Sequence, residues 1–430
     1  MSEDSAGKRK RRQCGQVDEV MTSSQSNNQN ANGYVITDIK QWFGGRGKAQ
    51  QILPVVDLRS ADEFDARRLS FSVEHRRKGT IVNLPLDALL SGDRSCELPP
   101  RNLEFAILVP KVHTGAFSRT DGCVVHQLFF SEFSSSTKQT RKPWMVKQVL
   151  FDNDELWNAA DELNLLQNKE SASNRLKQPL KQPRLWNPDP LVTELMPLLK
   201  NWLAHEYDNQ MGLVYDLGSG AGRDVCYLAE ETKEFLSLQK CNRSLHFVGV
   251  DNHKGSARRC DPFWESRGVT HLTSTCLLDL NRLKKVQEHF VDATRPDAAI
   301  DHGRRPTVLC LYAVRFLNRK LLTYLASATD KSNMERDDDA TTETSPKQSM
   351  HAPPPSIELE TGTIIAISHF CKPHVGAPWP FEHPKETSVL DRHELTTLFS
   401  SKNWHVIKDE IVRDGDHGRN LIQFIAKKVS

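Results

Sequence analysis

Short apolar runs alternate with amphipathic stretches in two separate parts of this chain. In the first part, apolar runs over 52–58, 80–85, 104–109 and 146–151 predict buried strands, and the apolar spacing over 60–68, 124–130 and 155–166 predicts helices. In the second part, runs over 213–217, 246–250, 272–278, 308–312 and 363–368 predict further strands, with helices between them that include 319–326. Strands that alternate with helices are typical of parallel sheets. We therefore predict an α/β fold.

Polar segments divide these two parts. With 430 residues the chain is too long for one ordinary core, so two domains are expected, over 34–166 and 188–430. Residues 1–33 have almost nothing to bury and predict a disordered tail. Residues 167–187, rich in Lys, Gln and Pro, predict a linker, and a polar, acidic stretch over about 330–356 predicts a disordered insertion in the second domain.

Charge and cysteine content limit the partners and the compartment. The 57 Lys and Arg residues nearly balance the 55 Asp and Glu residues, which gives no general reason to expect a polyanionic partner. A basic block from Lys8 to Arg12 is typical of a nuclear address, a phosphate-binding patch or a solvated charge run, so nucleic acid stays open. No apolar run is long enough for a signal peptide or a membrane span, and nine cysteines without a Cys-x-x-Cys pair fit a reducing compartment. We expect an intracellular, cytoplasmic or nuclear protein with free thiols.

A glycine-rich turn follows the first strand of the second part. Asp216 lies near the carboxyl end of the run 213–217, and Gly218, Ser219, Gly220 and Gly222 precede a helix that begins near Arg223. Glycine is favoured where backbone passes close to a ligand or adopts a positive φ. At this point of a doubly wound sheet the turn predicts a nucleotide-like ligand, although Asp216 could equally be a structural carboxylate.

Two ligands compete for this turn, a dinucleotide and S-adenosylmethionine. The dinucleotide fingerprint needs a third glycine where Arg223 stands, and its acidic residue follows after about 20 positions, whereas Asp251 follows Gly218 after 33. Asp251 ends the next strand, where its carboxylate is able to accept both ribose hydroxyls. Asp279 ends the third strand beside Leu280, where an acid and an apolar cover suit an adenine ring, although an Asp before a turn is also common for local reasons.

These residues resemble a known family. The run Asp-Leu-Gly-Ser-Gly-Ala-Gly at 216–222, Val-Gly-Val-Asp at 248–251, Asp279 and the run 314–322 look like class I S-adenosylmethionine-dependent methyltransferases, and the patterns at 364–370, 390–395 and 404–410 are similar to the tellurite-resistance branch. The resemblance covers 188–430 apart from the insertion. It implies a Rossmann-like fold, S-adenosyl-L-methionine as cofactor and a small-molecule methyl acceptor, such as a thiol or a chalcogen oxyanion.

The first part resembles a rhodanese homology domain. Asp57-Leu-Arg59 and Asn83-Leu-Pro85 stand where that family has its Asp-x-Arg and Asn-x-Pro signatures. The family's persulfide-bearing cysteine follows the next strand, but the loop from Pro110 to Gly115 contains no cysteine. The resemblance therefore implies a rhodanese-like domain without sulfurtransferase activity. Sulfur transfer from Cys96 or Cys123 at an unexpected place remains the main alternative activity.

Catalytic residues are harder to assign from the sequence, because methyl transfer needs alignment more than a fixed catalytic group. Arg315 and His369 are candidates. Arg315 either neutralises an anionic acceptor or forms a surface ion pair, and His369 either accepts a proton or lines the substrate pocket. His369, Cys371, His374 and His383 match no defined ligand spacing, so no metal site is expected. A non-enzymatic scaffold and an RNA methyltransferase stay open, although no Asn/Asp-Pro-Pro-Tyr run follows the fourth strand.

Overall fold

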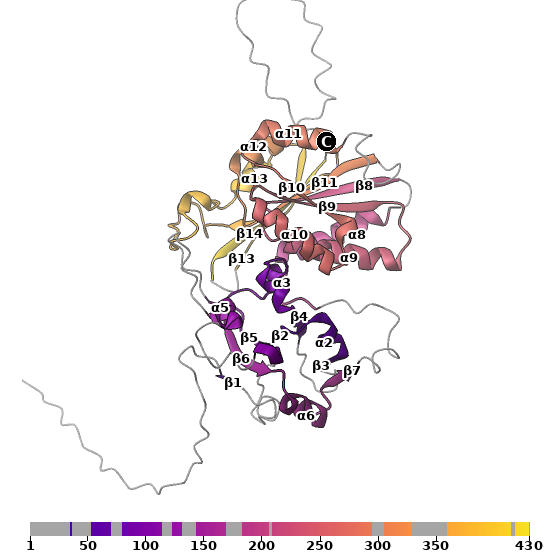
Figure 1. The fold of residues 1–430 in the computed structure, drawn as a ribbon. Coiled ribbons are helices and arrows are strands. Elements are labelled where there is room, and N and C mark those ends of the chain that lie inside the picture. The colour runs from indigo at the N-terminus through magenta and orange to yellow at the C-terminus, as the bar shows by residue number, and fades with distance from the viewer. Residues whose placement is uncertain are drawn as a thin grey trace, which may run out of the picture.

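The computed structural model describes residues 35–36, 53–69, 80–113, 123–130, 143–168, 183–205, 209–294, 305–327, 359–413 and 418–429. Within these ranges the chain forms two mainly parallel sheets, one from each part of the sequence (Figure 1). The predicted tail, most of the predicted linker and the insertion over about 330–356 lie outside the described residues.

The first sheet has five parallel strands in the order β1-β6-β5-β2-β4. Its strands are β1 (Val35–Ile36), β2 (Val55–Asp57), β4 (Ile81–Asn83), β5 (Phe105–Val109) and β6 (Val146–Phe151). Helices α3 (Leu86–Leu90) and α5 (Val124–Phe130) share a core with one face, and α6 (Asp154–Glu162) packs on the other. The apolar runs predicted as strands, and the helix predicted over 124–130, are confirmed.

Two helices of this part are shorter than predicted. Helix α2 (Ala61–Ala66) begins at a capping box of Ser60 and Glu63 but ends before Arg67, and α6 ends at Glu162. The residues that follow form a small antiparallel sheet of β3 (Arg67–Leu69) and β7 (Leu166–Asn168). This pairing places Leu69 in the core at 3 % exposure, so a contact distant in sequence decides where both helices end.

The second sheet has seven strands in the order β10-β9-β8-β11-β12-β14-β13. Five are parallel: β8 (Gln210–Leu217), β9 (Ser244–Asp251), β10 (Thr273–Leu277), β11 (Arg305–Val314) and β12 (Ile364–Phe370). Then β14 (Asn420–Lys428) pairs antiparallel with β12 and with β13 (Trp404–Arg413). Every apolar run predicted as a strand in this part lies largely within one of these strands.

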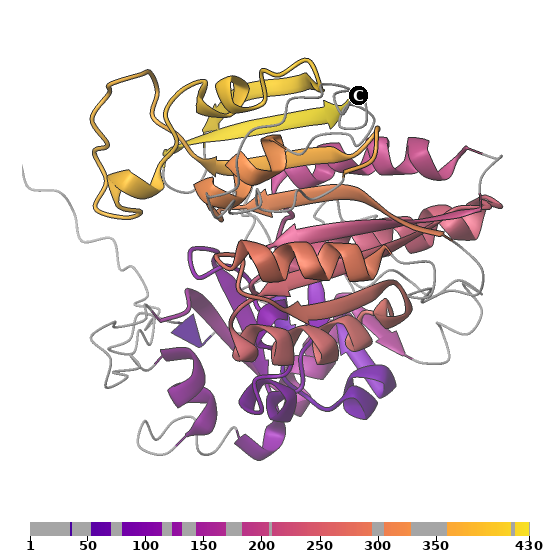
Figure 2. The same cartoon turned by 90° about the horizontal axis from the view of Figure 1, so that it is seen from above.

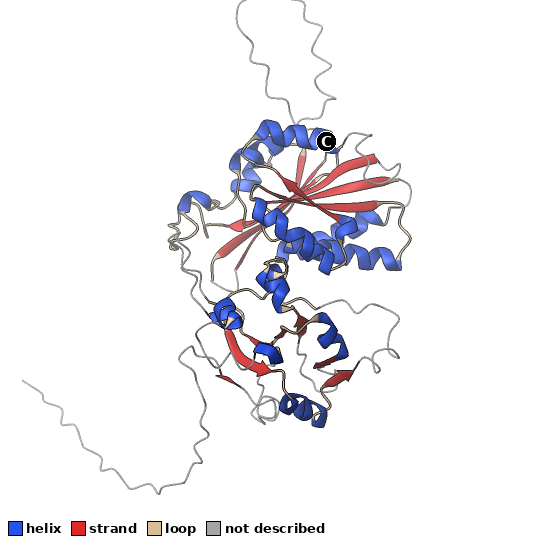
Figure 3. Ribbon diagram, in the orientation of Figure 1, coloured by secondary structure: helices blue, strands red, loops and turns tan. Residues whose placement is uncertain are grey.

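Helices cover both faces of this sheet, as Figures 2 and 3 show. One apolar core is shared with α8 (Pro190–Leu203), α9 (Arg223–Leu238) and α10 (Lys254–Ser266). The other is shared with α11 (Leu283–Ala293), α12 (Arg319–Ala326) and α13 (Glu394–Leu398). The second part is therefore a three-layer α/β unit, in agreement with the predicted fold class.

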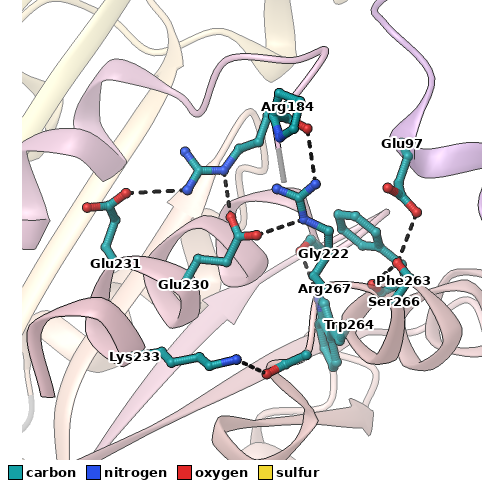
Figure 4. Close-up of polar contacts among 12 residues, drawn as sticks. Glu97, Arg184, Gly222, Glu230, Glu231, Lys233, Phe263, Trp264, Ser266 and Arg267 are labelled. Carbon is teal, nitrogen blue, oxygen red and sulfur yellow. Dashed lines mark hydrogen bonds and ion pairs between the residues drawn. The ribbon is translucent and has the colours of Figure 1, made fainter. Parts of the chain in front are cut away.

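The residues just before α8 are packed although they were predicted as the end of a linker. Leu185 and Trp186 are buried, the first in a core of the first sheet and the second in the core beneath α9 and α10. Figure 4 shows Glu230 of α9 between two guanidinium groups, with Arg184 Nε at 2.6 Å and Arg267 Nε at 2.7 Å from its oxygens. Because all three side chains are largely buried, removal of any one of them would leave an uncompensated buried charge where the chain enters α8.

No helix in the described ranges is both long enough and apolar enough to span a lipid bilayer.

Candidate functional site

The strand order reverses between β8 and β11. From β8 the chain builds outward to β9 and β10, and it then crosses back to β11 and β12 on the other side. In open parallel sheets, ligands bind outside the carboxyl ends of the strands at such a reversal. The candidate site therefore consists of the loops that follow β8, β9, β10 and β11.

The loop after β8 is the glycine turn predicted from the sequence. Gly218, Gly220 and Gly222 have φ of +85°, +54° and +67°. The amides of Gly218 and Ser219 both donate to the carbonyl of Val250, at 2.8 and 3.0 Å. The turn is thus bonded directly to the end of β9, and Gly222 is the N-cap of α9.

The glycines of this turn differ in their surroundings. A Cβ atom on Gly222 would lie 2.8 Å from both Cys260 Sγ and Trp264 of α10, and one on Gly218 would lie 2.6 Å from the ring of Phe316 in the loop after β11. A Cβ atom on Gly220 would meet nothing within 4 Å. The outer two glycines therefore allow close packing of the protein, and only the middle one faces open space.

Asp251 holds the middle of the turn. One carboxylate oxygen accepts the Gly220 amide at 3.0 Å, and the other accepts the His253 amide at 2.7 Å. A carboxylate has about four acceptor positions, so two remain for a ligand. The structure thus shows the structural role directly, and the ribose-binding role stays a prediction.

The loop after β10 is hydrogen-bonded to residues at the ends of β9 and β11. The amide of Leu278 donates to the carbonyl of Asp251 at 3.1 Å, and the side-chain amide of Asn318, after β11, donates to the carbonyl of Leu280 at 3.0 Å. Asp279 accepts hydrogen bonds from Asn281, which lower the pKa of its exposed carboxyl. Leu280 is packed in the core beside α11, so of this predicted adenine pair only Asp279 is partly open to solvent.

Asp216 lies deeper than the turn. It is 3 % exposed, and its register partner across the reversal is Tyr312 of β11. Burial raises the pKa of Asp216 well above its ordinary value, and the nearby Asp224 and Asp251 carboxylates raise it further. Burial also raises the pKa of the Tyr312 hydroxyl. Asp216 is thus a buried acid beneath the site.

Asp224 is a site residue that the sequence analysis missed. It lies in the first turn of α9 and accepts the backbone amide of Asp189, which caps α8, at 3.2 Å. Burial raises the pKa of Asp224 to about 6, although the hydrogen bond from the Asp189 amide opposes this effect. Two local features of the sequence could have indicated Asp224. One is its place just after the glycine turn, and the other is the Asn-Pro-Asp-Pro run at the start of α8.

Arg315 occupies the loop after β11, as predicted. Its φ is +55°, uncommon for a residue other than glycine, and its amide donates to the carbonyl of Ser368 in β12 at 2.7 Å. The charge of its exposed side chain lowers the pKa of Asp224. Ser368 in turn donates to Asp189 at 3.1 Å. Arg315 therefore lies at the crevice, next to the acids beneath the turn.

His369 lies apart from these residues. It is 4 % exposed, its Nε2 donates to the carbonyl of Ser388 at 2.7 Å, and its pKa is lowered, chiefly by burial. Its charged neighbours are Arg319 and Glu394 of α12 and α13, on the face opposite Asp189 and α8. Its role as a proton acceptor stays a prediction that this position does not favour.

The His and Cys residues near the end of β12 do not converge. His369 and Cys371 are buried, whereas His374 and His383 are exposed. Within the described residues, no group of three or more His, Cys, Asp or Glu side chains is arranged to hold a metal ion.

In the first sheet, the residues of the two short signatures contact one another. Asp57 and Arg59 form a buried ion pair at 2.7 Å, and the Asn83 side chain donates to the carbonyl of Arg59 at 2.9 Å. Burial raises the pKa of Asp57, although the charge of Arg59 opposes this effect. Neither Cys96 nor Cys123 is near solvent, with exposures of 4 % and 1 %.

No protein-family model matches the chain, and no curated protein does either. Among solved structures, the O-methyltransferase TomG from Streptomyces achromogenes in complex with SAM is similar at 12 % identity and a TM-score of 0.33, over 60 % of this chain and 94 % of that one. A SAM-dependent methyltransferase from Thiobacillus denitrificans in complex with S-adenosyl-L-homocysteine has 12 % identity and a TM-score of 0.28, over 60 % and 95 %. The [4+2]-cyclase SpnF has 12 % identity and a TM-score of 0.32, over 55 % and 80 %. Similarities with TM-scores this low carry no argument about the function of this chain.

Proposed function

We propose that the second unit is an S-adenosylmethionine-dependent methyltransferase that acts on a small-molecule acceptor. The observation that carries the proposal is the glycine turn at the strand reversal. Its middle amide is held by the Asp251 carboxylate, and its middle glycine borders open space. Backbone that is fixed, free of side chains and beside an acid at a strand end suits an adenosine-containing ligand.

Two features argue against a dinucleotide. The dinucleotide-binding order is 3-2-1-4-5-6, whereas here the strands after the first five form an antiparallel pair, with β14 between β12 and β13. In addition, Arg223 occupies the place of the third glycine. In the dinucleotide fold, that glycine permits close packing of the helix against the strand, and a side chain at this place prevents the same packing.

The residues that would hold the cofactor follow from the loops. Asp251 would accept the ribose hydroxyls through its remaining lone pairs, and Asp279 would accept from the adenine amino group. The backbone around Ser219 and Gly220 would lie along the remainder of the ligand, with Gly218 and Gly222 supporting the turn. When bound, the cofactor supplies an activated methyl group on a sulfonium. The protein's own contribution is to align the acceptor and exclude water.

The small-molecule acceptor rests on the resemblance to the tellurite-resistance branch. Arg315 stands at the crevice, where its charge would stabilise an anionic acceptor such as a thiolate or a chalcogen oxyanion. An RNA acceptor remains the second candidate among methyltransferases. Its only support, the basic block from Lys8 to Arg12, lies outside the described residues.

Calorimetry with purified full-length protein tests the cofactor. We expect S-adenosylhomocysteine to bind and NAD not to bind under the same conditions. Binding of NAD alone, or of neither ligand, would overturn the proposal and favour a dinucleotide enzyme or a scaffold. Labelled methyl transfer into a cell extract, separated into small molecules, RNA and protein, then identifies the acceptor class.

We further propose that the first sheet is a rhodanese-like domain without sulfurtransferase activity. The contact of Asn83 with Asp57 and Arg59 supports the resemblance, because the two signatures meet in space. No cysteine occurs between Pro110 and Gly122, and the thiol of Cys96 packs in the core under α9 and α10. A persulfide carrier needs an accessible thiolate of low pKa, so neither Cys96 nor Cys123 suits sulfur transfer.

A further inference from the structure

Arg223 connects the glycine turn to the first part of the chain. It is the first residue of α9, directly after Gly222, and its side chain donates from Nε to the carbonyl of Cys96 at 2.7 Å and from Nη2 to the carbonyl of Leu98 at 2.8 Å. Cys96 belongs to the short helix η2 (Ser95–Glu97), which lies between α3 and β5 of the first sheet. We name residues 95–98 the docking segment.

The docking segment also contacts α10. Ser266 donates to Glu97 at 2.9 Å, a bond that Figure 4 shows, and Cys96 Sγ lies 3.8 Å from the carbonyl of Arg259. Glu97 is only 2 % exposed and forms an ion pair with Arg94. The segment thus rests against the two helices that border the turn.

Helix α10 holds the turn from its other side. Trp264 Nε1 donates to the carbonyl of Gly222 at 3.0 Å, and Cys260 Sγ lies 3.7 Å from the carbonyl of Gly220. The same helix therefore bonds the docking segment through Ser266 and the turn through Trp264. Two routes, one through Arg223 and one through α10, join the docking segment to the backbone of the turn.

The position of Arg223 is unfavourable unless it has a partner. A cation in the first turn of a helix opposes the helix dipole, and the Arg223 side chain is half-buried here. The carbonyls of Cys96 and Leu98 compensate both costs, because they are acceptors and carry partial negative charge. The side chain that replaces the third fingerprint glycine is thus occupied in docking the first part of the chain.

We infer that Arg223 is a positioning residue through which the docking segment orders the glycine turn, so that cofactor affinity depends on the first part of the chain. The dependence on cofactor rests on the proposed function, whereas the ordering of the turn does not. Charge-assisted hydrogen bonds of this kind have net contributions that correspond to about a tenfold change in an equilibrium constant or more. Arg223 itself need not touch the ligand.

The test uses full-length variants and two measurements. Arg223→Met keeps most of the apolar stem but removes both donors, Arg223→Lys keeps one charged donor group, and Glu97→Ala disturbs the docking segment without altering the turn. Arg392→Met, which breaks a comparable pair with Asp409 elsewhere in the second unit, is the matched control. Amide hydrogen exchange without ligand reports the order of residues 95–98 and 218–222, and calorimetry reports S-adenosylhomocysteine affinity.

We expect Arg223→Met to speed exchange in both segments and to weaken S-adenosylhomocysteine binding about tenfold. Arg223→Lys should lie between Arg223→Met and the parent, Glu97→Ala should change both measurements in the same direction, and Arg392→Met should change neither.

Unchanged exchange at 218–222 in both Arg223→Met and Glu97→Ala would overturn the inference. So would weaker binding in Arg223→Met alone with normal exchange, since that marks a direct ligand contact. If the parent binds no S-adenosylhomocysteine, the proposed function fails while the exchange data still decide this inference. If Arg223→Met does not fold, Arg223→Lys and Glu97→Ala decide it.

Discussion

The Asp251 carboxylate accepts the Gly220 amide at 3.0 Å, which fixes the only glycine of the turn that borders open space. Asp251→Ala removes this bond and the predicted acceptor of the ribose hydroxyls. We expect S-adenosylhomocysteine binding to weaken by about 1.5–3 kcal/mol, the range for hydrogen bonds to a charged group. Calorimetry measures the change, with Asp261→Ala on the exposed side of α10 as the control. Unaltered affinity in a folded Asp251→Ala protein would remove Asp251 from the binding site.

Alanine substitutions within the turn should separate packing from ligand binding. Gly222→Ala places a Cβ atom 2.8 Å from Cys260 and Trp264 at a positive φ, so its cost combines backbone strain and overpacking. We expect a loss of about 2–5 kcal/mol in the free energy of unfolding. Gly220→Ala has the same kind of φ but no neighbour, so about 1–2 kcal/mol is expected.

Urea denaturation measures both losses, and calorimetry adds the ligand affinity of Gly220→Ala. That variant should bind S-adenosylhomocysteine poorly although it loses less stability than Gly222→Ala, because its new methyl group enters the open space. Equal destabilisation of the two variants, or normal binding by Gly220→Ala, would contradict the geometry of the turn.

Asp224 should make stability depend on pH. Burial raises its pKa from 3.8 to about 6, so between these values the folded protein keeps a proton that the unfolded chain releases. The free energy of unfolding therefore falls as pH rises through this window. Asp224→Asn removes the effect but keeps an oxygen for the Asp189 amide. We expect the variant to exceed the parent by up to roughly 2–3 kcal/mol near neutral pH, with little difference near pH 4.

Urea denaturation across this pH range checks the Asp224 prediction. Asp261→Asn, an exposed acid of α10, serves as the control and should show no such divergence. A gap between Asp224→Asn and the parent that is constant with pH would show that the Asp224 carboxyl does not titrate in this window.

Cysteine chemistry in the first part should be absent. Cys96 is 4 % exposed, and burial raises the pKa of its thiol to about 11, so little thiolate exists near neutral pH. We expect no cyanolysable sulfur on the full-length protein after treatment with thiosulfate. Cys96→Ser and Cys123→Ser variants should show the same background as the parent. Rapid formation of a persulfide that disappears in one of these variants would instead establish a sulfurtransferase.

The sequence by itself determined most of the parallel strands and the glycine turn. Buried parallel strands need continuous apolar runs, and three closely spaced glycines allow the positive φ that this turn requires, so both signals are local. The helix over 319–326 was likewise predictable, because Asn318 supplies its own cap and its leucines recur on one face. Asp251 was recognisable as a candidate site residue because it directly follows an apolar run, which is also a local signal.

Only the tertiary structure decided what depends on residues distant in sequence. Helix α2 ends at Ala66 because the next residues pair with β7, almost one hundred positions later. Asp224 has a raised pKa because α8 and α9 bury it together, and His369 lies on the face opposite Asp189 because β12 turns alternate side chains to opposite sides. Arg223 reads as an ordinary surface charge in the sequence. Its role in docking Cys96 and Leu98 exists only because the fold brings residues 127 and 125 positions apart into contact.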